Sequence, residues 1–208
     1  EKKIKLIYHG VNFEKFKNPV KKLKKQGNPE LLIVSRISPA KRIDTLIKAI
    51  PIIKKKYPNV LLNIIGKPSE FTPTQKFYEE LKQLTQDLKL TENIKFLGEI
   101  PNSEISSYLH KCDLFITTGL AYKTTLEGIA AKKPIIMQKD CLELIFPELS
   151  EEQKQQISFE PQNPTDLANK ILDHTDKPLN DNLYDLTKNK FDMPVFISRA
   201  IEEFNKLI

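Results

Sequence analysis

Short apolar runs alternate with longer amphipathic segments along most of the chain. The runs are rich in β-branched residues and nearly continuous in apolarity, as in strands that are buried on both faces. They are KLIYH (5–9), ELLIVS (30–35), VLLNII (60–65), NIKFL (93–97), DLFITT (113–118), PIIM (134–137) and QISFE (156–160). The amphipathic segments place Leu, Ile and Ala opposite Lys and Glu, which predicts helices over 42–56, 74–88, 102–110, 124–132, 164–173 and 193–207.

The repeated order of strand, helix and strand predicts the fold class. Such alternation is typical of an α/β protein with a doubly wound parallel sheet, that is, a Rossmann-like fold. No internal repeat, low-complexity tract or domain boundary interrupts it. We therefore expect a single domain over residues 1–208, with the helix over 193–207 closing the chain.

Composition narrows the range of partners. The chain of 208 residues has 33 basic and 27 acidic residues and a formal net charge of +6. Only Arg36, Arg42 and Arg199 are arginines, and the aromatic residues are few and scattered, so nucleic-acid binding is not expected. The densest basic run, residues 14–30, is read as a solvated loop and short helix, with contact to an anionic membrane surface as the alternative.

The location of the protein is inferred from its apolar content. No run of 18 apolar residues exists, and the first ten residues do not resemble a signal peptide. We expect a cytoplasmic protein, with peripheral membrane association left open. Cys112 and Cys141 lie outside any CxxC pattern, which favours two buried thiols over a disulfide or a zinc site.

Four of the six glycines follow directly on predicted strands. They are Gly10, Gly66, Gly98 and Gly119. Open α/β sheets bind ligands beyond the carboxyl ends of their strands, and glycine lets a ligand approach the backbone closely. Each glycine could equally serve only a tight turn, and the pattern does not decide between the two.

Two cations lie at the same end of one predicted strand. Arg36 lies at the end of the strand predicted over 30–35, as the residue directly after it, and Lys41 follows at the start of the next helix. A guanidinium can bind two phosphate oxygens, and an ammonium adds a second charge near helix-start amides that favour anions. The pair therefore suits a diphosphate.

Glu127 has two interpretations. It lies three residues after Thr124, so the two residues match a capping box in which Thr124 is the N-cap. Alternatively, its carboxylate accepts hydrogen bonds from ribose hydroxyls, as acids do in dinucleotide-binding sheets. The residue pattern alone favours the cap.

Taken together, the motifs resemble the C-terminal domain of retaining GT-B glycosyltransferases of group 1 (GT4-like). The resemblance is collinear over residues 4–175 and runs through IYHGVNFEKF, LLIVSRISPAKRIDTLIKAIPIIKKKYPNVLLNIIGKPSE, NIKFLGEIPNSEISSYLHKCDLFI, TTLEGIAAKKPII and ISFEPQNPTDLANKIL. It implies retaining transfer of a hexose from a UDP-, GDP- or ADP-sugar, without a metal or another cofactor. It also implies an N-terminal domain of the same protein that binds a glycan, lipid-linked or protein acceptor.

The resemblance also assigns roles to residues. Arg36 and Lys41 would hold the donor diphosphate and stabilise it as it leaves. Glu127 would bind the ribose and could cap its helix as well. The remaining candidates border the phosphates or the base, and are Gly66, Leu97, Gly98, Ile100, Thr124 and Thr125.

Two departures from the family pattern leave an alternative open. Gly119 stands where the first glutamate of the family's E-x7-E motif would face the donor sugar, and CLELIFPELSEE replaces a glycine-rich loop after residues 134–137. The second hypothesis is a non-catalytic nucleotide-sugar-binding subunit that partners an active glycosyltransferase. A third is a related GT-B enzyme, such as an epimerase or a phosphorylase, although no lysine has a fitting context for the pyridoxal phosphate that a phosphorylase needs.

Overall fold

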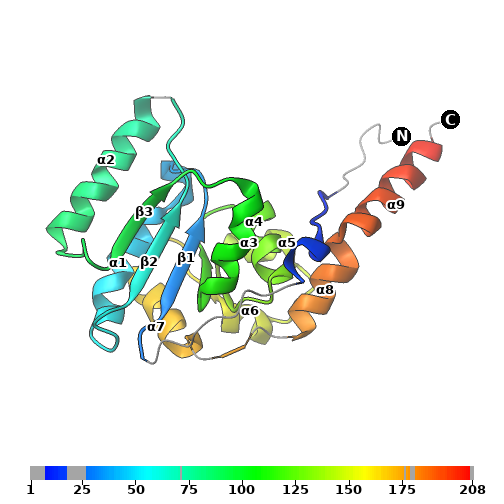
Figure 1. Cartoon of the computed structure of the whole chain (residues 1–208). Helices are drawn as coiled ribbons and strands as arrows, with labels where there is room; N and C mark the ends of the chain where they lie inside the picture. The colour runs from blue at the N-terminus through cyan, green and yellow to red at the C-terminus, as the bar shows by residue number, and fades with distance from the viewer. Residues whose placement is uncertain (1–7, 18–26, 71, 176, 179–180, 207–208) are drawn as a thin grey trace.

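The computed structural model of the chain describes residues 8–17, 27–70, 72–175, 177–178 and 181–206. Within them lies one parallel six-stranded sheet in the order β3-β2-β1-β4-β5-β6 (Figure 1). The strands are β1 (Glu30–Val34), β2 (Leu61–Ile65), β3 (Ile94–Gly98), β4 (Leu114–Thr117), β5 (Ile135–Gln138) and β6 (Ser158–Phe159). The doubly wound parallel sheet predicted from the sequence is confirmed.

The direction of strand order reverses at β1. This strand pairs with β2 on one side, where Leu32 lies opposite Asn63, and with β4 on the other, where Leu31 lies opposite Leu114. The connections after β1 and β4 leave the sheet in opposite directions. Such a switch point has a crevice beyond the carboxyl ends of the strands. A candidate site is therefore expected between the segments that follow β1 and β4.

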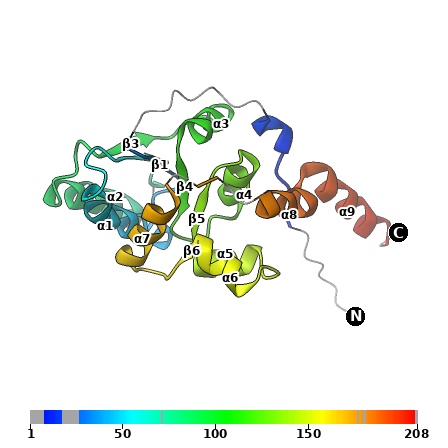
Figure 2. The same cartoon turned by 90° about the horizontal axis from the view of Figure 1, so that it is seen from below.

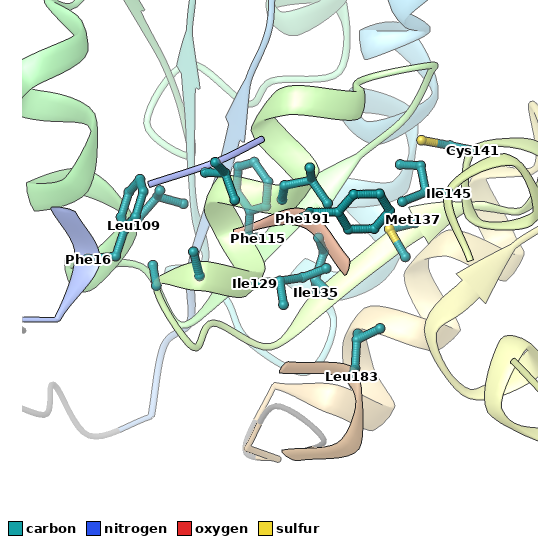
Figure 3. Packing of buried hydrophobic residues seen from close by; sticks show 14 of the residues in the cluster. Phe16, Leu109, Phe115, Ile129, Ile135, Met137, Cys141, Ile145, Leu183 and Phe191 are labelled. Atoms are coloured by element: carbon teal, nitrogen blue, oxygen red, sulfur yellow. The ribbon is translucent and has the colours of Figure 1, made fainter. Parts of the chain in front are cut away.

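Alternate side chains of each central strand enter two separate cores. In β4, Phe115 packs on one face of the sheet, whereas Leu114 and Ile116 pack on the other. The first core, shown in Figure 3, gathers residues from α3 (Asn102–Lys111), α4 (Tyr122–Ala130), α5 (Lys139–Ile145) and α8 (Asp181–Phe191). The second lies under α1 (Ile43–Lys54), α2 (Thr72–Asp87) and α7 (Pro164–His174), on the opposite face (Figure 2). Burial on both faces explains why the strands read as continuous apolar runs.

The six predicted helices are present with small changes at their ends. They are α1, α2, α3, α4, α7 and α9 (Met193–Asn205). The sequence interpretation missed α5, α6 (Glu151–Ile157) and α8. Within the described residues, no helix combines the length and the apolarity needed to cross a bilayer. Both cysteines are buried free thiols, as predicted.

The predicted strand over residues 5–9 is not part of the sheet in its described portion. Residues 5–7, and most of the basic run at 18–26, lie outside the described residues. Tyr8 and His9 have no regular structure. Val11 instead bridges to the junction of α8 and α9, where its amide donates to the carbonyl of Phe191 at 2.8 Å. Gly10 packs against Phe196 of α9 rather than ending a strand of the sheet.

The last helix, α9, lies at the predicted position but extends away from the rest of the domain (Figures 1 and 2). None of its residues is buried, and it does not cover the sheet. Ile197, Ile201 and Phe204 are exposed along it. Its preceding residue, Asp192, accepts a hydrogen bond from the amide of Met193 and so caps its first turn.

Candidate functional site

A cavity of about 420 Å³ opens at the switch point of the sheet. Its walls come from the ends of β1 and β2, from the segments that follow β1, β2 and β3, and from the first two turns of α3 and α4. The lining residues are Val34, Ser35, Arg36, Ile65, Gly66, Lys67, Pro68, Ser69, Glu99, Ile100, Asn102, Ile105, Lys123, Thr124 and Glu127. The structure thus brings Arg36, Gly66, Ile100, Thr124 and Glu127, all predicted from the sequence, to one cavity.

Gly66 makes the floor of this cavity possible. Its φ of +139° is a conformation that L side chains rarely adopt, and a Cβ there would overlap the carbonyl oxygen of Ser35. Its amide donates to the carbonyl of Gly98 at 2.7 Å. The chain after β2 therefore lies directly against the segments that follow β1 and β3, and only glycine allows this approach.

The two predicted cations come from the turn between β1 and α1. Arg36 is exposed and lines the cavity, and no carboxylate forms an ion pair with it in the part of the chain that the structure describes. Lys41 is half-buried beside it and donates from Nζ to the carbonyl of Leu120. Burial, and then the charge of Arg36, lower the pKa of Lys41 below its ordinary value. Two cations held this close favour an anionic ligand, because an anion would relieve their repulsion.

Glu127 lies in the second turn of α4 and lines the cavity. Only 6% of the residue is exposed. Burial raises the pKa of its carboxyl group, while Lys123 and Lys15 act in the opposite direction. The Lys123 ammonium lies 4.0 Å from Glu127 Oε1. A buried carboxylate facing a cavity is an acceptor for hydroxyl groups, since most of its hydration has already been removed.

The capping-box interpretation of Glu127 is wrong. Helix α4 begins at Tyr122, its N-cap is Ala121, and no side chain caps it. Thr124 lies inside the first turn, and its hydroxyl donates back to the carbonyl of Ala121 at 3.3 Å. Glu127 therefore lies too far into the helix to reach an N-cap amide, and the structure leaves the cavity as the place where its carboxylate can act.

The N-terminus of α4 adds positive potential to the same region. The first bond of the helix runs from the amide of Thr125 to the carbonyl of Ala121 at 2.9 Å. The amides of Tyr122, Lys123 and Thr124 consequently have no partner within the helix. Aligned peptide dipoles place partial positive charge at such an end, which favours phosphate groups.

Four predicted residues do not line the cavity. Leu97 packs toward the core on the α3 and α4 side, and Gly98 contributes its carbonyl to Gly66. Thr125 is fully buried with its hydroxyl beside the thiol of Cys141, so its side chain is not available to a ligand. Lys41 is not among the lining residues, and its ammonium donates to the carbonyl of Leu120.

Sequence reasoning missed several residues of the cavity. Lys67 and Glu99 form an ion pair of 2.5 Å between the loops after β2 and β3, and both side chains are largely exposed. Asn102, the first residue of α3, accepts hydrogen bonds from Lys15 Nζ at its main-chain oxygen (2.6 Å) and at Oδ1 (2.8 Å). Only Lys123 carried a local signal, because it precedes Glu127 by one helical turn.

Gly119 occupies a closed position rather than an open one. A Cβ built there would lie 2.5 Å from the carbonyl oxygen of Ala40 and 2.9 Å from Cα of Lys41. Any side chain at 119 would therefore displace backbone atoms of the β1–α1 turn. The loop between β4 and α4 follows a path that excludes an acid at this position.

The segment after β5 is helical. Helix α5 starts at Lys139, immediately after β5, where a glycine-rich loop was the family expectation. Cys141 and Leu142 of α5 are buried in the core shown in Figure 3. None of the residues that line the cavity comes from this helix.

The fold and the position of the cavity define a Rossmann-like α/β domain with its candidate ligand site at the topological switch point. The family described as "Glycosyl transferases group 1" matches residues 14–190. The chain belongs to this family.

Two relatives are alpha-monoglucosyldiacylglycerol synthases. The protein from Streptococcus pneumoniae is 29% identical over 149 residues, which cover 64% of this chain and 32% of the relative. The protein from Acholeplasma laidlawii is 31% identical over 134 residues, which cover 62% of this chain and 30% of the relative. The matched part of this chain thus spans about a third of each relative.

Solved structures share the fold. A crystal structure of Anabaena HepE in complex with UDP and glucose has a TM-score of 0.79 at 22% identity, covering 97% of this chain and 56% of HepE. The C-terminal domain of the group 1 family protein LpcC from Francisella tularensis has a TM-score of 0.71 at 24% identity, covering 88% of this chain and all of that domain (100%). The fold is therefore that of the C-terminal half of GT-B glycosyltransferases.

Proposed function

We propose that this domain binds a nucleotide-sugar donor in the switch-point cavity and forms the donor half of a retaining group 1 glycosyltransferase that transfers a hexose. The observation that carries the proposal is the meeting of Arg36 and Glu127 in one cavity, with Lys41 and the N-terminus of α4 beside it. In this proposal the cations would hold the diphosphate, and the carboxylate would accept hydrogen bonds from the ribose.

The chemistry follows from where charge develops. When the bond between the sugar and the diphosphate breaks, negative charge gathers on the departing diphosphate. Arg36, Lys41 and the first-turn amides of α4 would stabilise that charge without needing to reorganise. Ile100 and the β3–α3 loop would border the base.

Relatives support a choice of donor and acceptor for this proposal. HepE has been crystallised with UDP and glucose, and TarM of S. aureus with UDP, which makes a UDP-sugar our first candidate and GDP- or ADP-sugars the alternatives. Two relatives are named for a glucosylated diacylglycerol, which supports a lipid acceptor over a free glycan or a protein. We infer that an N-terminal domain of the same protein binds the acceptor, and that the whole protein works in the cytoplasm, at or near a membrane surface.

A single wall of a cleft is not sufficient for transfer. Orienting two reactants lowers a barrier by roughly 7–11 kcal/mol, and a leaving diphosphate is strongly stabilised only where water is excluded. We therefore expect the 208-residue chain to bind nucleoside diphosphates weakly and to transfer no sugar.

The proposal is tested by calorimetry and thermal shift with UDP, GDP and ADP. A ligand at 100 times its dissociation constant stabilises the folded state by about 2.7 kcal/mol, so the melting temperature should rise with one of the three. Inorganic phosphate serves as the control for simple anion binding. Binding of none of the three, or equal binding of phosphate, would contradict the proposal, and sugar transfer by this chain alone would contradict the half-site.

A second candidate is a non-catalytic donor-binding subunit that partners an active glycosyltransferase. It is favoured by Gly119, where the structure has no room for a sugar-facing acid. The two candidates differ in the behaviour of the full-length protein. Turnover of a donor by that protein supports the enzyme, whereas binding without hydrolysis or transfer supports the subunit.

Arg36→Lys is expected to weaken UDP binding although the charge is kept. An ammonium cannot reproduce the two-pronged contact of a guanidinium, and one charged hydrogen bond contributes about 1.5–3 kcal/mol, which corresponds to a ten- to hundred-fold loss. Calorimetry measures the change. Arg199→Lys, the same substitution on exposed α9, is the control and should bind as the wild type does. Unchanged affinity in Arg36→Lys would remove this residue from the site.

A further inference from the structure

The loop between β4 and α4 is fastened to the turn between β1 and α1 by contacts in both directions. The hydroxyl of Thr118 donates to the carbonyl of Lys41 at 2.5 Å. In return, Lys41 Nζ donates to the carbonyl of Leu120. These two contacts, between residues 77 and 79 positions apart in the chain, form a reciprocal clamp on the two sides of the switch point.

Gly119 lies between these two contacts and allows them. With no side chain, its Cα rests against the backbone of Ala40 and Lys41, as the 2.5 Å and 2.9 Å distances from a built Cβ show. The clamp therefore depends on the glycine that replaces the family's first glutamate.

The turn that the clamp holds has a conformation that needs support. Arg42 has φ 51° and ψ 36°, in the left-handed region, and joins the short helix η2 (Pro39–Lys41) to α1. A non-glycine residue pays for this conformation in strain, so neighbouring contacts must hold it in place. The Thr118 hydroxyl, which is buried, binds the carbonyl immediately before Arg42.

The clamp fixes the position of the Lys41 ammonium. Through Leu120 it is held next to Ala121, the N-cap of α4, and it lies close enough to Arg36 for the two charges to interact. Arg36, Lys41 and the helix N-terminus can act together on one anion only while this arrangement persists. Thr118 controls it without reaching the anion, because its hydroxyl is directed to the main chain of Lys41.

We propose that Thr118 is a positioning residue that sets the place of Lys41 for binding of the donor diphosphate. The proposal rests on the proposed function, and it goes further by naming a residue and a mechanism that no motif of the sequence indicated. Thr118 acts through the main chain of Lys41, so its effect on affinity must disappear when the Lys41 ammonium is removed.

The experiment measures UDP affinity by calorimetry, with melting temperatures, in a set of threonine variants. Thr118→Val removes the hydroxyl at nearly equal volume. It should weaken UDP binding about ten-fold, because the displaced Lys41 ammonium would lose one charged hydrogen bond to the diphosphate. Thr118→Ser keeps the hydroxyl and should bind UDP as the wild type does. Thr187→Val is the matched control, because Thr187 is fully buried in α8 and its hydroxyl donates to the carbonyl of Leu183 at 2.6 Å, away from the cavity.

The same substitution is repeated in a Lys41→Met background. If Thr118 acts through Lys41, Thr118→Val adds no further loss there, whereas independent effects would add. If Thr118→Val does not fold, Thr118→Ala removes the same hydroxyl without adding a methyl group.

The outcomes separate this proposal from the proposed function. A wild-type protein that binds no nucleoside diphosphate overturns both. If the wild type binds UDP and both Thr118→Val and Thr118→Ala bind it with the affinity of the wild type, the positioning role alone is overturned. An additive loss in the Lys41→Met background, or a Thr118→Ser variant as weak as Thr118→Val, overturns it as well.

Discussion

Glu127→Gln is expected to yield a protein that melts at a higher temperature at neutral pH and yet binds UDP ten- to hundred-fold more weakly. The two effects have opposite signs because they come from the same burial. Burial of Glu127 raises the free energy of its charged form in the folded protein. The same desolvated carboxylate is the proposed acceptor for the ribose hydroxyls. An amide is neutral and keeps one acceptor oxygen, so it is stable in place but binds ribose less well. The loss in affinity corresponds to about 1.5–3 kcal/mol for a charged hydrogen bond.

The pH dependence follows from the raised pKa of Glu127. Its ordinary value is 4.5, and burial raises it in the folded protein. Between these two values the folded state holds a proton that the unfolded state has lost, so the stability of the wild type falls as the pH rises through that window. Below 4.5 the carboxyl group is protonated in both states and the cost is absent. The melting temperature of Glu127→Gln should therefore exceed that of the wild type at pH 7 and match it in acid.

The control for this variant is Glu92→Gln. Glu92 is exposed in the segment before β3, at the opposite end of the sheet from the cavity, so neither melting nor UDP affinity should change. A Glu127→Gln protein that is less stable at neutral pH would show that the carboxylate is stabilising after all. Wild-type affinity in the same variant would remove Glu127 from the ribose.

Gly119→Glu, which restores the first acid of the E-x7-E motif, is expected to destabilise the domain and to weaken UDP binding. The new Cβ would meet the carbonyl oxygen of Ala40 at 2.5 Å and Cα of Lys41 at 2.9 Å. These are backbone atoms, so relief requires movement of the loop or the turn. Overpacking of this kind costs about 1–3 kcal/mol, and each kcal/mol lowers the melting temperature of a domain of this size by about 2–4 °C. UDP affinity falls as well because the displaced turn carries Lys41.

Leu120→Glu is the matched control for Gly119→Glu. It adds a carboxylate at the adjacent position, where 55% of the side chain is already exposed, and should leave the melting temperature nearly unchanged. A Gly119→Glu variant that is as stable as the wild type would show that the loop adapts easily. If that variant also allowed the full-length protein to turn over a donor that the wild type does not, the closed position would be a loss of function in evolution rather than a requirement of the fold.

Local pattern was sufficient for most secondary structure, and the reason is burial. Each central strand fills two cores, so its residues are apolar whichever way they point, as in ELLIV of β1. The helices α1 and α7 have an apolar face and a charged face over three turns. This length is sufficient for the helical period to be detected in the sequence. In contrast, α5 and α6 have seven residues each, too few for a period. Helix α8 buries Thr187 between Leu183 and Phe191, so its buried face is not uniformly apolar.

The start of α4 shows where local pattern misleads. The T-x-x-E motif predicts a helix that begins at Thr124, but the helix begins at Tyr122. Tyr122 packs edge-on against Phe191 of α8, with ring centroids 5.8 Å apart. That contact joins residues far apart in the chain, and the first residue of the helix is packed although no side chain caps α4. The capping hypothesis failed because it weighed only neighbours in sequence.

The sequence by itself determined the doubly wound α/β class, the order of most elements and the presence of two cations after the first strand of the sheet. Each of these features depends on residues a few positions apart in the chain, which set the hydrophobic periodicity and the turns. Tertiary structure alone decided that Arg36 and Glu127 face one cavity, that Thr125 turns inward to Cys141, and that Gly119 has no room for a side chain. The physical reason is that these properties depend on distances between segments that meet only across the sheet. Side-chain direction, desolvation and steric closure are set by the neighbours that the fold supplies.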